Sequence, residues 1–431
     1  MNFFGTDGIR GTYGSTLTDS TAYLLGKSLA LIGEDCPIVV VARDTRNSGE
    51  KLFGALASGV YDGGGNVINL GILPTNAVGH FVRKFGGDFG VMITASHNPP
   101  CDNGLKVFDR YGVKLCAAKQ EKLSQLMDCL PLPDGHLQRV HEPVFYDIDN
   151  IYRDDVIRAV GARLDGMKVA LDCCFGASCR VAGSVFEAAG ANVCTINDRA
   201  CGDKINVDCG ATHPEVIADF CKGKGIALGF AFDGDADRLV VSEGGRIVPN
   251  NKVYYAIAKF MSEEGLLKQN TVVGTTLTNG GVVRALSGVG VSLLRSDVGD
   301  TNVFNLMAAN ALNFGGEESG HYLLTDFATS SDALINALFV AAIVCRRGSL
   351  AEYSKECTDV PYVQQSIALC DSNELLTTKT ALNDVATQVR KLYPECRVVL
   401  RKSGTENKLR VYVEGCEAEE AYKQIAATFA K

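Results

Sequence analysis

Along this chain, apolar segments of strand length repeatedly end in loops of polar side chains. Residues 89–93 form one such segment, with the loop Thr94-Ala95-Ser96-His97-Asn98-Pro99 after it, and residues 226–232 form another. Segments with helical spacing separate these strands, which is the pattern of an α/β fold. Because ligands bind at the carboxyl ends of strands in open α/β sheets, each polar loop is a candidate site.

The chain is too long, at 431 residues, for one hydrophobic core. Strands and helices alternate over most of it, and a separate strand–helix–strand–strand–helix order closes it. We therefore predict three similar mixed α/β domains plus a smaller C-terminal α+β domain, and we interpret 131–150 as a linker. The expected domains are 1–145, 146–247, 248–357 and 358–431. An early helix is predicted over 20–32, with Asp19 or Ser20 as its N-cap.

Composition excludes several classes of function. The chain has 42 basic and 50 acidic residues, for a net charge of −8, and no basic tract interleaves with aromatic residues, so we expect no nucleic-acid partner. The longest apolar run, 333–345, contains Asn336 and falls short of the ~20 residues that span a bilayer, so it is predicted to be a buried helix and no membrane partner is expected.

The first residues have neither a basic nor an apolar stretch, so no signal peptide is expected. The 16 cysteines are scattered, with no C-x-x-C pair, which argues against a zinc site. Together these features predict a cytoplasmic protein with reduced thiols.

Three carboxylates stand at alternate positions directly after the strand at 226–232, in the motif Asp233-Gly234-Asp235-Ala236-Asp237. Carboxylates this close repel one another unless a cation neutralises them, and a hard divalent ion is the natural partner. An EF-hand is excluded, because Arg238 and Gly244 stand where its glycine and glutamate belong. A solvated acidic turn remains the alternative. Mg²⁺ usually completes its six ligands with water and substrate phosphate, so a phosphate is expected nearby.

The loop at 401–410 joins two strands and reads Arg401-Lys402-Ser403-Gly404-Thr405-Glu406-Asn407-Lys408-Leu409-Arg410. Guanidinium groups, small hydroxyls and a flexible glycine suit a phosphate dianion. On these residues alone, a solvated charged hairpin is an equally good interpretation.

The loop at 313–321 carries Glu317, Glu318, Ser319 and His321. Donors and acceptors at this density suit the hydroxyls of a sugar, and His321 could act as an acid or a base. A glycine-rich turn is the alternative. In the first loop, Ser96 lies at the end of a rigid strand with His97 beside it. Nucleophiles often occupy such a position, although a buried strand followed by a polar turn would have the same sequence pattern.

Taken in order, these loops resemble the α-D-phosphohexomutase family along the whole chain. Four motifs carry the resemblance, as the phosphoserine, magnesium, sugar-binding and phosphate-binding loops: Thr94 to Pro99, Asp233 to Arg238, Gly316 to His321, and Arg401 to Arg410. The resemblance implies four domains around a central active-site cleft, and monomers or homodimers.

The resemblance also implies roles for individual residues. Ser96 would carry a phosphoryl group and, through it, contact one Mg²⁺ per subunit held by Asp233, Asp235 and Asp237. A sugar bisphosphate would be the activator. Proton transfer and charge stabilisation would fall to five residues: His97, Lys106, Arg10, Arg238 and His321. Substrate would be bound by Glu317, Ser319, Arg401, Ser403, Gly404, Thr405 and Arg410.

Within the family, the segment Phe4 to Gly11 most resembles the bacterial branch that converts glucosamine 6-phosphate to glucosamine 1-phosphate through a bisphosphorylated sugar, for amino-sugar nucleotide and cell-wall precursor synthesis. The chain departs from that branch at Asn407, at 300–303 and at Glu318. Glucose or mannose phosphate with the same mechanism is therefore the alternative. More distant alternatives are a magnesium-dependent sugar phosphatase and a phosphosugar sensor without catalysis.

Overall fold

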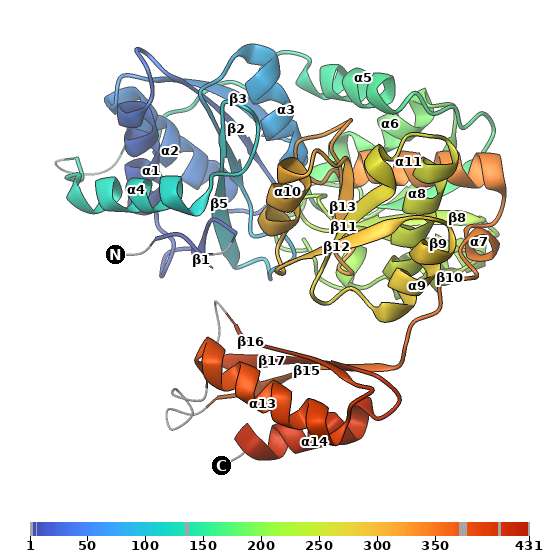
Figure 1. Ribbon diagram of the computed structural model, residues 1–431. Coiled ribbons are helices and arrows are strands. Elements are labelled where there is room, and N and C mark those ends of the chain that lie inside the picture. The colour runs from blue at the N-terminus through green and yellow to red at the C-terminus, as the bar shows by residue number, and fades with distance from the viewer. Residues whose placement is uncertain (1–2, 6, 134–137, 370–376, 404–406, 430–431) are drawn as a thin grey trace.

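The computed structural model describes residues 3–5, 7–133, 138–369, 377–403 and 407–429 (Figure 1). Crossing a membrane takes a long apolar helix, and the described ranges contain no helix of that kind.

The first domain, from β1 to α4, is a five-stranded sheet in the order β1-β5-β4-β2-β3 with helices on it. β2 runs parallel to β3 and β4, whereas β5 is antiparallel to both of its neighbours. Its elements are β1 (Ile9–Thr12), α1 (Asp19–Ile32), β2 (Ile38–Arg43), α2 (Gly49–Asp62), β3 (Asn66–Ile72), α3 (Thr75–Phe85), β4 (Phe89–Ile93), β5 (Asp102–Asp109) and α4 (Ala117–Cys129).

The second domain, from α5 to β10, repeats this sheet with the order β10-β9-β8-β6-β7. β6 is parallel to β7 and β8, and β9 is antiparallel to β8 and β10. Its elements are α5 (Ile148–Val160), β6 (Lys168–Asp172), η1 (Ala177–Arg180), α6 (Ala182–Ala188), β7 (Asn192–Ile196), η2 (Gly210–Thr212), α7 (Glu215–Lys224), β8 (Leu228–Phe232), β9 (Leu239–Glu243) and β10 (Arg246–Val248).

The third domain, from α8 to α12, has the same arrangement in four strands, ordered β12-β11-β13-β14. β11 is parallel to β12 and β13, and β14 is antiparallel to β13. Its elements are α8 (Asn250–Glu263), η3 (Lys268–Asn270), β11 (Thr271–Thr275), α9 (Gly280–Gly288), β12 (Ser292–Ser296), α10 (Asp300–Ala309), β13 (Phe314–Gly316), β14 (Tyr322–Leu324), α11 (Ala333–Arg347) and α12 (Leu350–Tyr353).

The fourth domain, from β15 to α14, is a three-stranded antiparallel sheet in the order β15-β17-β16. It lies apart from the other three at the bottom of Figure 1, with α13 and α14 on the face of its sheet. Its elements are β15 (Tyr362–Ala368), α13 (Lys379–Leu392), β16 (Arg397–Lys402), β17 (Lys408–Glu414) and α14 (Ala418–Phe429). The prediction of three similar α/β domains and a smaller α+β domain is confirmed.

Three of the polar loops occupy equivalent places in their sheets. β4, β8 and β13 each lie between a parallel neighbour and an antiparallel one, and each is followed by its loop before the antiparallel strand returns. Each loop therefore stands at the carboxyl end of a central strand, the position at which open α/β sheets bind ligands.

The apolar run at 333–345 is buried in α11, as predicted. It belongs to one hydrophobic core that also takes in α3 and α5, so residues of the first, second and third domains pack together. The close packing of α1 on α2 depends on glycine, because a Cβ on Gly26 would lie 2.1 Å from the carbonyl oxygen of Leu56.

One local prediction is wrong, and another gains detail. The N-cap of α1 is Thr18, whose Oγ1 accepts a hydrogen bond from the Thr21 amide, rather than Asp19 or Ser20. The segment 131–150, interpreted as a linker, does join α4 of the first domain to α5 of the second, which begins at Ile148. Within it, the amide of Phe145 donates a hydrogen bond to the carbonyl of Asn69 at 2.7 Å. Main-chain pairing with β3 thus ties the described part of this segment to the first domain.

Candidate active site

The loop after β4 holds Ser96 in an uncommon backbone conformation. Its φ of +53° lies in the left-handed region, which residues other than glycine rarely adopt. The Ser96 amide donates to Thr94 Oγ1 at 2.9 Å, and the Thr94 hydroxyl donates to Asp44 Oδ2 at 2.6 Å. These contacts fix the turn, so the Ser96 side chain has a defined direction.

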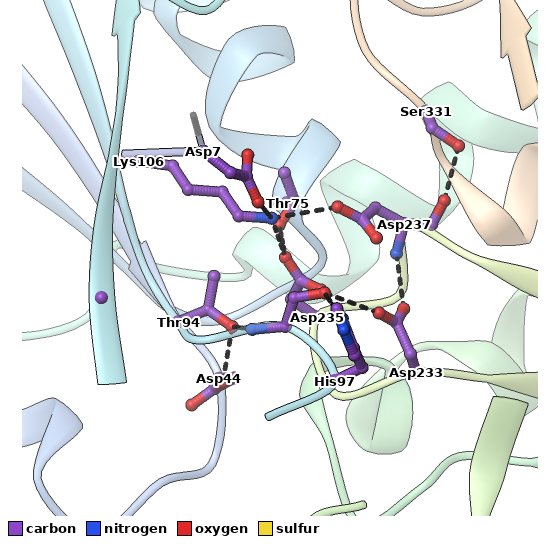
Figure 2. A network of polar contacts seen from close by, with 12 residues as sticks. Asp7, Asp44, Thr75, Thr94, His97, Lys106, Asp233, Asp235, Asp237 and Ser331 are labelled. Atoms are coloured by element: carbon purple, nitrogen blue, oxygen red, sulfur yellow. Dashed lines mark hydrogen bonds and ion pairs between the residues drawn. The ribbon is translucent and has the colours of Figure 1, made fainter. Parts of the chain in front are cut away.

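That direction is towards the aspartate loop of the second domain. Ser96 is 2% exposed, and its Oγ donates a hydrogen bond to Asp233 Oδ2 at 2.9 Å. His97 Nδ1 lies 3.2 Å from the same Oγ, and Figure 2 shows the His97 ring beside Asp233. The structure therefore brings the hydroxyl, the imidazole and the first carboxylate of the triplet together.

The three carboxylates of the aspartate loop converge on one point. Asp233, Asp235 and Asp237 are buried, and each offers an oxygen within 4.8 Å of the other two. Oδ1 of Asp235 and Oδ1 of Asp237 are buried without a hydrogen-bond partner among the described residues. Burial, together with the charges of Asp237 and Asp235, raises the pKa of Asp233 to about 8. Unpartnered oxygens and mutual repulsion fit a hard divalent cation.

Lys106, from β5, supplies part of the missing positive charge. Its Nζ donates to Asp235 Oδ2 at 2.7 Å and to Asp237 Oδ2 at 3.0 Å, and lies 3.7 Å from Asp7 Oδ2 (Figure 2). Burial opposes the charge, but the three carboxylates outweigh it and raise the pKa of Lys106 well above its ordinary value. A lysine held as an ammonium ion suits charge stabilisation better than proton transfer.

A second layer of charges joins the first and third domains. Lys114 Nζ donates to Asp7 Oδ1 at 2.7 Å and to Asp300 Oδ2 at 2.5 Å. Nε2 of His321 lies 3.6 Å from Asp237 Oδ2 and 3.8 Å from Asp300 Oδ2. Burial opposes protonation of His321, but Asp237 and Asp300 raise its pKa overall. His321 therefore binds a proton more readily than an ordinary histidine, next to the triplet.

The remaining basic residues predicted from the sequence face the same region. Burial and the charges of Arg238 and Arg10 lower the pKa of His97 to about 4, so its imidazole is neutral at physiological pH. Arg10 pairs with Asp7, and the buried Nε atoms of Arg10 and Arg238 have no hydrogen-bond partner within the described part of the chain. These groups can meet an anionic ligand.

A cavity of about 930 Å³ connects this region to the fourth domain. Arg10 and His97 line it from the first domain, and Arg401, Ser403 and Arg410 line it from the fourth. The structure thus brings the predicted phosphate-binding residues opposite the serine loop. Gly404 and Thr405, predicted with them, lie outside the described residues.

The predicted sugar-binding residues are in a different position. Glu317 and Ser319 are not among the described residues that line this cavity. Glu317 Oε1 accepts a hydrogen bond from the Gly299 amide at 2.9 Å, and the buried Ser319 Oγ has no partner among the described residues. Glu318, between them, forms a side-chain hydrogen bond with Gln364 of the fourth domain. Burial raises the pKa of Glu318 to about 7.

Several residues of the site were not selected from the sequence. Arg46, 1% exposed, donates to Asp44, to three carbonyl oxygens of the serine loop and to that of Asp102 at the start of β5; the three in the loop are those of Ser96, Asn98 and Pro99. Because Asp44 and Arg46 follow β2, the strand-end rule could have found them. Asp7, Lys114 and Asp300 gave no such signal, because they are joined by ion pairs between residues far apart in the sequence, and the pair of Lys114 with Asp300 crosses from the first domain to the third.

Comparison with known proteins matches every part of this architecture to one family. Four family models match in order: phosphoglucomutase/phosphomannomutase alpha/beta/alpha domain I at residues 1–130, domain II at 148–245, domain III at 249–360, and the C-terminal domain at 362–431.

Among full-length relatives, the phosphoglucosamine mutase of an Exiguobacterium strain is 36% identical, over 98% of this chain and 96% of that protein. The phosphoglucosamine mutase of Moorella thermoacetica is 38% identical, over 97% of this chain and 96% of that protein. A crystal structure of a phosphoglucomutase/phosphomannomutase family protein from Burkholderia thailandensis has a TM-score of 0.79 at 23% identity, covering 98% of this chain and 96% of that one. This last likeness concerns the fold.

Proposed function

The chain belongs to the phosphoglucomutase/phosphomannomutase family, and on that premise we propose that it is a phosphoglucosamine mutase, converting glucosamine 6-phosphate to glucosamine 1-phosphate. The observation that carries the proposal is the hydrogen bond from Ser96 Oγ to Asp233, inside a buried cluster of three carboxylates. A hydroxyl in that position can hold a phosphoryl group next to a cation site. The choice of glucosamine rests on the full-length relatives that carry the name phosphoglucosamine mutase.

In this proposal Ser96 is phosphorylated in the working enzyme. The free hydroxyl of the sugar phosphate attacks the phosphorus, the bond from phosphorus to Ser96 Oγ breaks, and the proton of the hydroxyl leaves. The bisphosphorylated sugar then turns around, and its other phosphoryl group passes to Ser96. Neutral His97, 3.2 Å from Ser96 Oγ, is the proposed carrier of the proton. A sugar bisphosphate would load Ser96 initially.

The proposed ligands of one Mg²⁺ are Asp233, Asp235, Asp237 and an oxygen of the phosphoserine. When bound, the ion would neutralise charge on the transferred phosphoryl group. Lys106 adds positive charge beside these carboxylates, and His321 would add more when it is protonated. Arg10 and Arg238 would contact the transferred group through their unpartnered N–H groups. All of these groups are in place before substrate arrives, which favours electrostatic stabilisation.

Arg401, Ser403 and Arg410, with Gly404 and Thr405, would hold the phosphate that is not being transferred. Glu317 and Ser319 would bind sugar hydroxyls. A cavity of about 930 Å³ leaves room for the intermediate to turn within the protein. Enclosure matters because water would otherwise hydrolyse the phosphoserine.

The product would serve amino-sugar nucleotide and cell-wall precursor synthesis in the cytoplasm, and the enzyme would act as a monomer or homodimer. Turnover of glucosamine, glucose and mannose phosphates by the Mg²⁺-loaded protein tests the substrate. We expect the highest kcat/KM with glucosamine phosphate. A clear preference for glucose or mannose phosphate would replace the proposed substrate within the same mechanism.

Intact mass before and after treatment with a hexose bisphosphate tests the mechanism. One phosphoryl adduct that maps to Ser96 is expected. Release of inorganic phosphate without isomerisation would instead indicate a phosphatase. Ligand binding with no turnover and no adduct would indicate a sensor.

A further inference from the structure

The main-chain carbonyl of Ser96 is held by side chains of two domains. Arg46 Nη2, from the first domain, donates to this oxygen at 2.9 Å, and Asn206 Nδ2, from the second, donates to it at 2.8 Å. Asn206 Nδ2 also donates to the carbonyl of Asn98 at 3.1 Å. One side-chain amide of the second domain therefore binds two carbonyl groups of the turn that contains the serine.

The orientation of the Asn206 amide is itself fixed. Its Oδ1 accepts a hydrogen bond from the Cys174 thiol at 3.1 Å, and Asn206 is 9% exposed. Its backbone is in the left-handed region, with φ of +60°. With its oxygen engaged by Cys174, the amide presents its N–H groups to the serine loop.

The aspartate loop touches the same carbonyl. A Cβ on Gly234 would lie 2.5 Å from the Ser96 carbonyl oxygen and 2.8 Å from Asn206 Nδ2, so only glycine permits this approach. Asn206, the Ser96 main chain and the backbone between Asp233 and Asp235 thus pack at one point. Any movement of the first domain against the second at this point would change the distance from Ser96 Oγ to Asp233.

We propose that Asn206 is a positioning residue for phosphoryl transfer, which docks the serine loop of the first domain onto the aspartate loop of the second. The proposal rests on the proposed function, because the reaction passes a phosphoryl group through Ser96 twice per turnover. Arg46 cannot play this part, since its hydrogen bonds to the described residues all lie within the first domain. The group to be transferred belongs to one domain and its carboxylates to another, so their alignment needs a contact across the boundary.

The test compares Asn206→Ala with Asn197→Ala in the Mg²⁺-loaded full chain. Asn197 is a matched control: it lies in the same domain, has φ of +51°, and donates to Asp172 Oδ1 at 3.0 Å. With the hexose phosphate that the wild type turns over, we expect Asn206→Ala to lower kcat roughly tenfold to a hundredfold, because small misplacement is costly in aligned transfers. KM should stay within about twofold, since Asn206 touches no sugar-binding group. Asn197→Ala should keep kcat within about twofold, whatever its effect on Tm.

Cys174 provides a second pair of variants. Cys174→Ser keeps a donor for Asn206 Oδ1 and should retain most of the kcat, whereas Cys174→Ala should lose several-fold. This pair decides the matter if Asn206→Ala does not fold. Equal kcat for the alanine variants of Asn206 and Asn197, or for the two Cys174 variants, would overturn the positioning role. A wild type that turns over no hexose phosphate would overturn the proposed function instead, so the two failures are distinguishable.

Discussion

The two ends of the active site are built differently. At the transfer centre Ser96, Lys106 and the three aspartates are at most 4% exposed, and their groups contact one another directly. At the phosphate end, Arg401, Ser403 and Arg410 face a cavity of about 930 Å³. Transfer between fixed atoms requires alignment, whereas a sugar that must present both of its ends requires room. In the proposed mechanism, the closed end would therefore fix the chemistry and the open end would accept either phosphate.

This comparison predicts that the largest loss follows removal of the serine hydroxyl. Ser96→Ala should lower kcat by on the order of 10³-fold or more, because no atom remains to accept the phosphoryl group. Intact mass should show no adduct after treatment with a hexose bisphosphate. Ser184→Ala is the control, since the hydroxyl of Ser184, on α6, donates to the carbonyl of Val181 at the N-cap of that helix, away from the site. Ser96→Ala with a tenth of the wild-type activity would remove the serine from the mechanism.

The next largest effect should come from Lys106, the ammonium buried among carboxylates. Lys106→Met leaves Asp235 and Asp237 without their shared partner, and breaking a buried ion pair costs about 3–5 kcal/mol. We expect a lower Tm without metal, a larger gain in Tm on adding Mg²⁺ than in the wild type, and a kcat lower by roughly a hundredfold.

Lys114→Met is the matched control for Lys106→Met. Lys114 is also a lysine among acids, but its partners are Asp7 and Asp300 rather than the aspartate triplet. It should lower Tm and leave the gain from Mg²⁺ as in the wild type. Equal Mg²⁺ responses in both variants would mean that the charge of Lys106 is not coupled to the cation site.

The sequence predicted the two ends unequally well, for a physical reason. Ser96 and the aspartate triplet each follow an apolar strand, so their role is visible in a few adjacent residues. The phosphate loop gave an ambiguous signal, because a charged hairpin looks the same without the cavity opposite it. The three similar α/β domains followed from local patterns, whereas the strand order of each sheet became clear only from the structure.

Contacts between distant residues could not be predicted. Asp300 meets Lys114 across 186 positions, and Asn206 meets Ser96 across 110. Such pairs depend on how the domains pack, and nothing in a single sequence encodes that locally. The linker at 131–150 shows a related limit. Its prolines and mixed charge indicate a break between domains, but they give no sign of the main-chain pairing with β3.

At the open end, Arg401→Ala should affect binding more than chemistry. Losing a guanidinium–phosphate contact costs about 1.5–3 kcal/mol, so KM should rise roughly tenfold or more. Since Arg401 is exposed and far from the transferred group in this proposal, kcat should fall only a few-fold and Tm should stay unchanged. Arg163→Ala is the control, because Arg163 is exposed and forms an ion pair with Asp165, outside the cavity. A variant of Arg401 with unchanged KM and a low kcat would contradict the division between the two ends.

The smallest expected effect concerns Glu318, which lies between the sugar-binding loop and the fourth domain. Burial raises its pKa to about 7, only partly offset by the hydrogen bond with Gln364, while Glu317 and Asp359 add repulsion. A carboxyl with a raised pKa in the folded state stabilises the protein while protonated, so this contribution is present below about pH 4.5 and is lost as the pH rises through about 7.

The Glu318→Gln side chain cannot ionise, so this variant avoids the loss of stability. The difference in Tm between Glu318→Gln and the wild type should grow from near zero at pH 4.5 to about 1–2 °C in favour of the variant at pH 8, measured without ligand. Glu187→Gln, on the exposed side of α6, should show no such growth. A constant difference across this range would mean that Glu318 is already solvated, and that the open end extends to the sugar-binding loop.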